Sequence, residues 1–282
     1  MQTKLGQVQK FKVLRETQIG YMLTITGEDE YFLHKNETDF RHLTEGEEVN
    51  GFLYSDKKAR IAVTLVTPNV TIDKPGFTKV IEVNNSLGAF LDIGISKDIL
   101  LSKDDLPIDY NEWPIEGDVL LCILRVKGDR LISKMLNKNE ILDLNLHFEL
   151  PLNQKVIGYV YRITEDGINI VTKNYNIVFV YKTNMRKKYR LGEEVNVRII
   201  KKNIDDYTGT LFDSKEEVIK EDSKKILDYL NKNNGIMSIT EKSDPTVIYK
   251  VFGMSKNAFK NALGSLYKAK QIEMDDEKVV LL

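Results

Sequence analysis

Residue types that crosslinks and metal sites require are scarce in this chain. Its 282 residues include one cysteine, three histidines and one tryptophan. A single cysteine excludes an internal disulfide, and we interpret Cys122, which stands in a predicted strand, as a small buried apolar residue rather than a nucleophile. The histidines are far apart in sequence, so no ligand spacing typical of zinc is present.

Enzymatic function is also disfavoured. Acidic residues are plentiful, but no grouping of Asp, Glu and His has the spacing of a metal-dependent nuclease site. The sequence therefore predicts a protein without metal, cofactor or catalytic activity.

Long apolar runs and an N-terminal targeting signal are missing too. Because a membrane-spanning helix needs about 20 apolar residues in succession, we expect a soluble cytoplasmic protein without membrane contacts. Hydrophobic residues make up 42% of the chain, which is enough to bury several cores.

What the sequence does contain is an internal repeat. The stretch 88–103, GAFLDIGISKDILLSK, combines a small-residue start, alternating apolar positions and a polar end. Residues 20–35 repeat this pattern at the same spacing, and a more divergent third copy covers residues 158–182. Each copy, extended outward, gives five short strands in about 65 residues, which is the size of a small closed Greek-key barrel such as the OB fold.

The repeated motifs run G-x-V, G-[AY]-[FM]-L, L-[HS]-K and G-[ED]-x-V, with an arginine near the last strand. This pattern resembles the S1 RNA-binding domain. Three such units followed by a winged helix resemble the bacterial conserved virulence factor B family. The resemblance implies RNA-binding regulation of gene expression, including virulence-associated genes, without enzymatic activity.

The tail has a helical period instead. Ser214 with Glu217 predicts a capped first helix, a short strand covers residues 236–239, and Asp244 opens a second helix. Ser255 caps a third helix, and a hairpin closes the chain. This order is typical of a winged helix. The residues expected to face inward are Ile248, Val251 and Phe252 in the second helix, and Phe259, Ala262, Leu263, Leu266 and Tyr267 in the third.

The fold class is therefore mostly β and multidomain: three tandem OB-fold, S1-like five-stranded barrels followed by an α/β winged-helix domain. The predicted divisions are 1–66 and 71–136 for two barrels, 137–153 for a connector, 154–213 for the divergent third barrel and 214–282 for the winged helix. The apolar connector is expected to pack against the second unit.

Charge is distributed unevenly between these units. Residues 71–150 carry 9 Lys and Arg against 14 Asp and Glu, whereas residues 151–213 carry 11 against 7. A polyanion is expected to prefer the C-terminal half, so a fragment 151–282 should hold most of the RNA affinity.

In the first two units, the resemblance to S1 domains selects four candidate RNA-binding residues. His34 and Arg60 match a base-stacking and a phosphate-holding position of unit one, while Phe90 matches the second aromatic position and Arg130 the basic position of unit two. Other aromatic positions have been lost, so a structural barrel with a solvated histidine remains an alternative for unit one. For unit two a packing or protein-contact role is favoured, and Trp113 is expected to form a rigid corner rather than a stacking platform.

In the third unit, aromatic residues and cations interleave, which is typical of a sequence-tolerant single-strand groove. The candidates include a cationic run that we expect to be exposed, and are Tyr175, Tyr181, Lys182, Arg186, Lys187, Lys188 and Arg190. The alternative is that the tyrosines fill the barrel and the run is a solvated loop.

The third helix of the tail presents a polar face with Asn257, Lys260, Asn261, Ser265 and Lys268. Lys260 and Lys268 are candidate contacts to RNA, or to DNA through the winged helix. An acidic wing argues against this, so a packing role is equally open.

The sequence thus favours a monomer that binds single-stranded RNA, mainly through the third barrel and the winged helix, and regulates expression post-transcriptionally. The alternative is a protein-interaction adaptor whose degenerate barrels are scaffolds.

Overall fold

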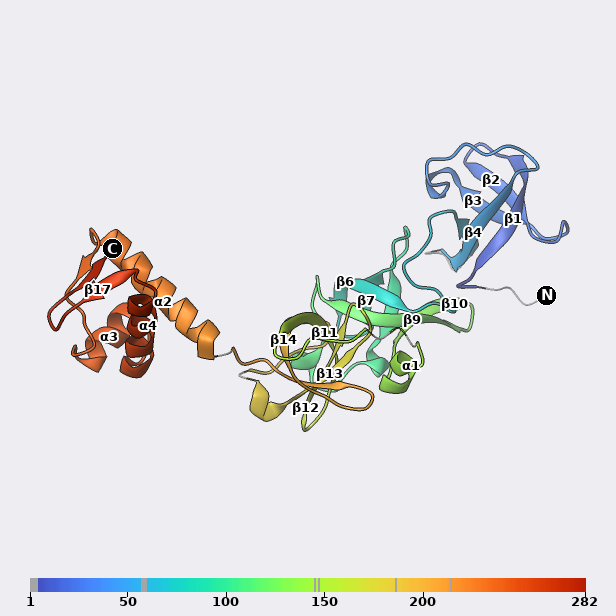
Figure 1. The fold of residues 1–282 in the computed structure, drawn as a ribbon. Helices are drawn as coiled ribbons and strands as arrows, with labels where there is room; N and C mark the ends of the chain where they lie inside the picture. Colours follow the sequence, from blue (N-terminus) through green and yellow to red (C-terminus); the bar gives the residue numbers. More distant parts are fainter. Residues whose placement is uncertain (1–4, 57–59, 145, 147, 186, 214) are drawn as a thin grey trace. The chain divides into compact units, whose positions relative to one another are not determined.

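A computed structural model describes residues 5–282 except 57–59, 145, 147, 186 and 214. It contains three closed five-stranded barrels and a three-stranded sheet with helices (Figure 1). The chain divides into two compact units, residues 1–211 with the barrels and residues 212–282 with the helices. The predicted fold class is confirmed.

The strands follow each other in the same order in every barrel. Barrel 1 consists of β1 (Val8–Glu16), β2 (Gly20–Thr24), β3 (Tyr31–His34), β4 (Glu48–Ser55) and β5 (Ile61–Thr64). Barrel 2 consists of β6 (Gly76–Asn84), β7 (Gly88–Asp92), β8 (Ile99–Ser102), β9 (Val119–Lys127) and β10 (Arg130–Met135). Barrel 3 consists of β11 (Lys155–Ile163), β12 (Gly167–Thr172), β13 (Ile177–Tyr181), β14 (Glu194–Lys202) and β15 (Tyr207–Thr210).

Each barrel closes through a parallel pairing of its third and fifth strands, while the other pairs are antiparallel. Alternate residues point inward, so β6 and β14 bury every second side chain over much of their length. Glycines start the second strands because their Cα atoms lie against the neighbouring backbone. A Cβ at Gly88 would stand 2.0 Å from the Leu101 carbonyl oxygen, and Gly88 has a φ of +130°.

One turn of 3-10 helix begins directly after the third strand of every barrel. These turns are η1 (Lys35–Glu37), η2 (Lys103–Asp105) and η4 (Lys182–Asn184). His34 caps the first of them with Nδ1, which accepts from the Asn36 amide at 3.1 Å, and Ser102 caps the second. The His or Ser at the second position of the motif L-[HS]-K therefore caps the 3-10 turn, in addition to any contact that it makes with RNA.

Barrels 1 and 2 meet through the outer surface of β4. Phe52 and Tyr54 are buried against Val70, Ile93 and Leu131 of the neighbouring barrel. At the edge of this contact Lys97 of barrel 2 donates to the backbone carbonyls of Ser55 and, at 3.1 Å, of Asp56. Burial lowers the pKa of the Lys97 amine.

Barrels 2 and 3 share a larger apolar seam. Phe77 of β6 packs between Tyr159 and Tyr175, with ring centroids 5.6 Å apart in both pairs. The predicted connector contributes α1 (Lys138–Leu142), whose Ile141 is fully buried in the same seam beside Tyr161. Leu146 and Phe148, which the sequence suggested would pack, are instead largely exposed, while Leu150 is buried in barrel 3.

Trp113 forms the rigid corner that the sequence predicted. It follows the short turn η3 (Tyr110–Glu112), is buried, and donates from Nε1 to the Pro107 carbonyl at 2.6 Å. Leu191 of barrel 3 packs in the same cluster. Cys122 is fully buried as expected, and burial raises the pKa of its thiol to about 11.

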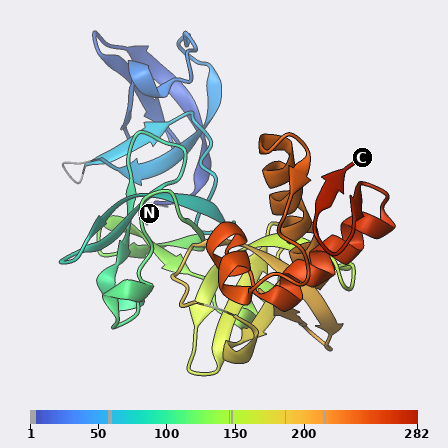
Figure 2. The same ribbon diagram turned by 90° about the vertical axis from the view of Figure 1, so that its left-hand side faces the viewer.

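The C-terminal unit has the element order predicted for a winged helix. Its elements, coloured orange to red in Figures 1 and 2, are α2 (Lys215–Lys232), β16 (Ile236–Met237), α3 (Pro245–Phe252), α4 (Lys256–Lys268), β17 (Ile272–Met274) and β18 (Val279–Leu281). Asp244 and Ser255 cap α3 and α4, and Gly253 ends α3 with a φ of 68°. The predicted cap at Ser214 lies outside the described residues.

Two inward-facing residues were predicted wrongly in this unit. Val251 is 40% exposed and Tyr267 is 53% exposed, whereas Ile248, Phe252, Phe259, Ala262, Leu263 and Leu266 are buried. Both misplaced residues lie in the last turn of their helix.

Candidate nucleic-acid interface

Each barrel has a row of side chains on its outer surface, and the strand register shows which residues of the three barrels occupy equivalent positions in this row. Directly paired residues on neighbouring strands point to the same face. In every barrel such a line starts at a bulge in the first strand and crosses the second and third; we call it the outer row. The outer rows are Arg15, Met22, Phe32 and Ala62 in barrel 1, Glu82, Phe90 and Leu100 in barrel 2, and Arg162, Asn169, Phe179 and Thr208 in barrel 3.

Barrels 1 and 3 carry an aromatic pair on the third strand of this surface. In barrel 3 the rings of Phe179 and Tyr181 meet edge to face at 4.8 Å, and Tyr181 is 48% exposed. In barrel 1 the rings of Phe32 and His34 meet in the same way at 6.2 Å. Such a pair offers a rigid face on which an unstacked base can lie. Barrel 2 has Leu100 and Ser102 at these positions.

The predicted phosphate contact of barrel 1 is already engaged by a neighbour. The Arg60 guanidinium donates twice to Asp56 Oδ2, from Nε at 2.9 Å and from Nη2 at 2.7 Å. The Arg60 side chain remains well exposed. Arg15 in the outer row is paired similarly, with Glu30 at 2.6 Å. Arg15 and Arg60 of barrel 1 are therefore charge-compensated.

The cationic run of barrel 3 departs from the expected free loop. Arg190 forms a bidentate pair with Asp118 of barrel 2, with distances of 2.8 and 2.9 Å, and only 28% of its side chain is exposed. That hydrogen bond raises the Arg190 pKa. The expectation of an exposed cation at Arg190 is wrong, because this residue closes the seam between two barrels.

The rest of this run is divided. Lys187 is exposed but paired with Glu193 at 2.6 Å, and its amine lies 4.8 Å from the Tyr189 ring centre. Lys188 is exposed and forms no hydrogen bond or ion pair with the described residues. Arg186 lies outside the described residues.

Two further cations of barrel 3 stand near the aromatic pair. Arg162 belongs to the outer row, and Lys182 directly follows Tyr181. Both are exposed, and neither has a hydrogen-bonded or ion-paired side chain within the described ranges. Tyr175, by contrast, lies against Phe77 in the seam, so the geometry favours packing over base stacking for this ring. Tyr159 and Tyr161 are buried in the same region, as the alternative interpretation of the tyrosines expected.

Barrel 2 brings Phe90 and Arg130 together in one cleft of about 490 Å³. Its walls also include Glu82, Leu87 and Leu100 from barrel 2, together with Asp56 of barrel 1. Phe90 is half-buried and Leu87 is exposed at the rim. The resemblance to S1 domains had linked Phe90 with Arg130, and the structure places both in the same cleft.

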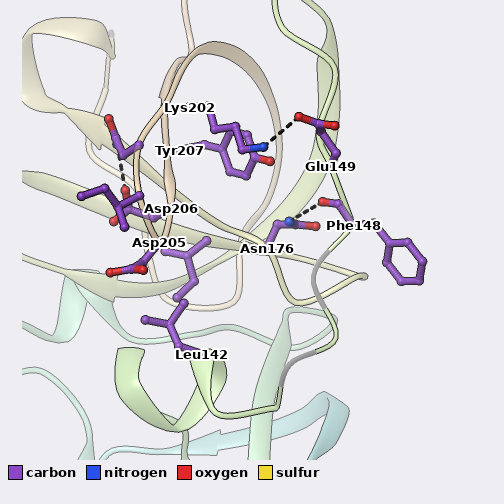
Figure 3. A pocket seen from close by; sticks show the side chains of 11 residues that line it. Leu142, Phe148, Glu149, Asn176, Lys202, Asp205, Asp206 and Tyr207 are labelled. Atoms are coloured by element: carbon purple, nitrogen blue, oxygen red, sulfur yellow. Dashed lines mark hydrogen bonds and ion pairs between the residues drawn. The ribbon is translucent and has the colours of Figure 1, made fainter.

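A second pocket, of about 390 Å³, lies at the end of barrel 3 against the connector (Figure 3). Glu149 and Lys202 form an ion pair of 2.8 Å at its edge, and Asn176 Nδ2 donates to the Phe148 carbonyl at 2.6 Å. None of the residues selected from the sequence lines this pocket.

In the winged helix, the polar face of α4 is exposed as predicted. Asn257, Asn261 and Ser265 are exposed, as is Lys268, whose amine has no ion-pair partner in the described part of the chain. Lys260 lies 3.5 Å from Glu241. Tyr267, expected inside, adds an exposed aromatic ring beside Lys268.

Sequence reasoning missed several outer-row residues. Phe32 and Glu82 were not selected as candidate RNA-binding residues, because the family motif marks neither position. Arg162 and Phe179 were noticed only as part of the interleaved cations and aromatics. The signal that would have found them is the internal repeat itself: aligning the units by their glycines places Phe32 and Phe179 two residues before His34 and Tyr181.

No helix among the described residues is long and apolar enough to cross a membrane. No group of three or more His, Cys, Asp or Glu with the geometry of a metal site occurs in the described ranges.

Tandem S1-type barrels with a winged helix define a protein of the nucleic-acid-binding, regulatory kind. Comparison with family models supports each part. Residues 5–66 match an S1 domain and residues 76–134 the CvfB first S1-like domain. Residues 149–209 match the second domain of virulence regulatory factor CvfB, and residues 224–281 the CvfB-like winged helix domain.

Full-length relatives agree. The chain is 30% identical over 284 residues to Conserved virulence factor B of Staphylococcus aureus, covering 98% of this chain and 94% of the relative. It is 33% identical over 266 residues to a Bacillus subtilis protein described as uncharacterized protein YitL, covering 93% and 89%. The chain therefore belongs to the conserved virulence factor B family.

A solved structure supports the same architecture. It is described as a multidomain protein with nucleic acid binding domains from Streptococcus pneumoniae TIGR4. The match has a TM-score of 0.66 and 30% sequence identity, and it covers 100% of this chain and 99% of the other.

Proposed function

We propose that this protein binds single-stranded RNA and regulates gene expression post-transcriptionally, including that of virulence-associated genes, in the bacterial cytoplasm. The main contacts lie on barrel 3 and the winged helix, and the protein acts as a monomer without catalysis or a metal. The observation that carries the proposal is the outer surface of barrel 3, where the exposed ring of Tyr181 and the half-buried ring of Phe179 stand beside unpaired cations.

The chemistry of that surface suits a single strand. Phe179 and Tyr181 offer ring faces to bases, and Arg162 and Lys182 are free to contact phosphates. Stacking accepts every base, whereas duplexes hide their bases, so single strands are preferred. On α4, Lys260, Lys268 and Tyr267 repeat the combination of cation and aromatic ring.

The test is a salt titration of binding with the full chain, using short single-stranded RNA, duplex RNA and duplex DNA. We expect single-stranded RNA to bind best, and log K to fall linearly with log salt because bound phosphates release counterions. Tighter binding of duplex DNA at all salt concentrations would assign the winged helix as the main reader and contradict the proposal.

Catalysis is tested in the same samples. We expect RNA length to stay constant over time, with and without a chelator. Shortening of the RNA that the chelator stops would show a metal-dependent nuclease.

The second candidate function is a protein-interaction adaptor. It is favoured by barrel 1, where Arg15 and Arg60 are compensated by Glu30 and Asp56. A full chain that binds no nucleic acid at low salt would support this alternative.

A further inference from the structure

The outer rows of the barrels differ in one charge at equivalent places. The residue at the bulge of the first strand is Arg15 in barrel 1 and Arg162 in barrel 3, but Glu82 in barrel 2. Each is paired directly with the centre of the second strand, so Glu82 lies beside Phe90. Barrel 2 therefore has a carboxylate where its neighbours have a guanidinium.

This carboxylate is uncommitted. Within the described residues Glu82 forms no hydrogen bond or ion pair, and the same holds for Arg130 in the same cleft. Two other charged groups of the cleft are engaged, because Asp56 binds Arg60 and Lys97 donates to the backbone of barrel 1. Asp98, which directly precedes β8, also lines the cleft, and its side chain forms no hydrogen bond or ion pair with the described residues. The contact from Lys97 fixes the wall of barrel 1 at the edge of the cleft.

The cleft thus offers four free groups to a ligand. They are an aromatic ring flanked by Leu87 and Leu100, the Glu82 carboxylate beside that ring, the Asp98 carboxylate, and one guanidinium. A matching ligand has a flat ring, adjacent hydrogen-bond donors on the ring edge, and an anion. A nucleotide has this combination, and the volume of about 490 Å³ falls within the usual range of ligand sites. A basic peptide would match the carboxylates but offers no anion to Arg130, whereas a nucleotide supplies both hydrogen-bond donors and a phosphate.

Among nucleobases, the edge chemistry favours guanine. Its N1–H and N2–H groups lie side by side and can donate to both oxygens of one carboxylate. Cytosine and adenine present one amino group next to a ring acceptor, and uracil presents a single N–H between two carbonyl oxygens. Carboxylates read exposed amino groups in this way, and single-stranded bases are read on their Watson–Crick edges.

We propose that barrel 2 is the base-selective module of the protein, in which Glu82 accepts hydrogen bonds from a guanine stacked on Phe90 while Arg130 holds a phosphate. This inference rests on the proposed RNA-binding function and deepens it. Barrel 3 supplies sequence-tolerant affinity, and barrel 2 adds a preference for strands that place a guanine in its cleft.

The experiment compares three RNAs of about 12 nucleotides, within the range of OB-fold site sizes. One is all uridine, one has a single central guanosine, and one has inosine at that position, which keeps N1–H and lacks the N2 amino group. Binding to the full chain is measured by fluorescence anisotropy at one salt concentration. We expect the guanosine strand to bind about 5-fold to 100-fold more tightly than the uridine strand, with inosine in between.

The variants are Glu82→Gln and Phe90→Ala, with Glu116→Gln as the matched control. Glu116 is an exposed residue of barrel 2 outside the cleft, and it has no ion-pair partner in the described chain. Glu82→Gln should lose the guanosine advantage and keep uridine binding, whereas Glu116→Gln should keep both. Phe90→Ala should lower guanosine binding without changing the uridine strand by more than about twofold, since barrel 3 provides that affinity.

The outcomes separate this inference from the proposed function. If no RNA binds, the proposed function fails. If RNA binds with equal affinity for guanosine and uridine, or if Glu82→Gln keeps the guanosine advantage, the assignment of Glu82 is wrong although the protein binds RNA. Competition by an arginine-rich peptide, but not by guanosine strands, would instead assign the cleft to a protein partner.

Discussion

Barrels 2 and 3 share strand order and register, yet their outer surfaces have opposite chemistry. Barrel 3 combines an aromatic pair with free cations, while barrel 2 has one aromatic ring, two free carboxylates and one free arginine. The backbone frame is the same, so a few side chains at fixed register positions decide what each barrel can contact. In the proposed division of roles, barrel 3 provides affinity for any single-stranded RNA and barrel 2 provides selectivity for a base, although both have the same fold.

Barrels 2 and 3 are also joined by a packed interface. Asp118 of barrel 2 and Arg190 of barrel 3 form the polar edge of an apolar seam that contains Phe77 and Tyr161. A cut after residue 150 would expose this seam, so a fragment 151–282 would lose more than its neighbour's binding surface. Substitutions in the full chain are therefore the sharper way to locate the RNA site.

The largest effect on binding is expected from the aromatic pair of barrel 3. Replacing both Phe179 and Tyr181 with Ala should weaken binding of an all-uridine RNA by about 1–3 kcal/mol per lost base contact, with little change in the salt slope. Phe90→Ala is the control in barrel 2. An equal loss in both variants would show that the two barrels do not differ as the outer rows suggest.

The next largest effect concerns stability. Asp118→Asn should lower the free energy of unfolding by about 1–3 kcal/mol, because the half-buried Arg190 loses its bidentate charged acceptor and keeps only the longer contact to Glu193 at 3.3 Å. Urea denaturation measures this loss. In the control, Glu48→Gln removes an exposed pair with Lys10 and should leave the free energy of unfolding nearly unchanged, because solvent screens this pair. Similar losses in both variants would show that the seam pair adds nothing beyond a surface ion pair.

Much of this architecture follows from sequence, because backbone requirements repeat. Gly20, Gly88 and Gly167 start the second strands, where close backbone approach excludes larger residues, and the helix caps of the tail use Asp244 and Ser255. These are local rules that a single sequence displays.

The candidate RNA-binding residues were harder to predict, because contacts between distant segments of the chain decide which side chains are exposed and unpaired. Nothing near Arg190 in sequence indicates that Asp118 binds it, and nothing near Tyr175 indicates that Phe77 covers it. Their sequence neighbours, Lys188 and Tyr181, remain available. A cation or an aromatic ring is available to bind RNA only if it is not already paired with, or packed against, another segment of the chain.

A charge exchange between the outer rows sharpens the comparison. Arg162→Gln should reduce the slope of log K against log salt by about 0.7, the value for one phosphate contact in a single strand. Glu82→Arg should increase the slope by a similar amount and strengthen binding of uridine RNA, because barrel 2 then gains the cation of its neighbours. An unchanged slope in both variants would place the strand away from the first-strand bulges.

The smallest effect is expected from the cationic run that looked most prominent in the sequence. If the cations at Arg186, Lys187, Lys188 and Arg190 were all exposed and free, replacing the four would flatten the salt slope by up to about three units. Lys187 is paired with Glu193 and Arg190 with Asp118, so each already has a carboxylate in place of a phosphate.

We therefore expect Lys188→Gln to reduce the slope by at most about 0.7 and Lys187→Gln by less, with similar weakening for all RNA sequences. Arg190→Gln should act on the unfolding midpoint rather than on the slope, because its guanidinium holds the seam between barrels 2 and 3. Salt titrations of the three variants, each with a urea curve, separate these roles. A slope change from Arg190→Gln as large as that from Lys188→Gln, at unchanged stability, would mean that Arg190 leaves Asp118 to bind the strand.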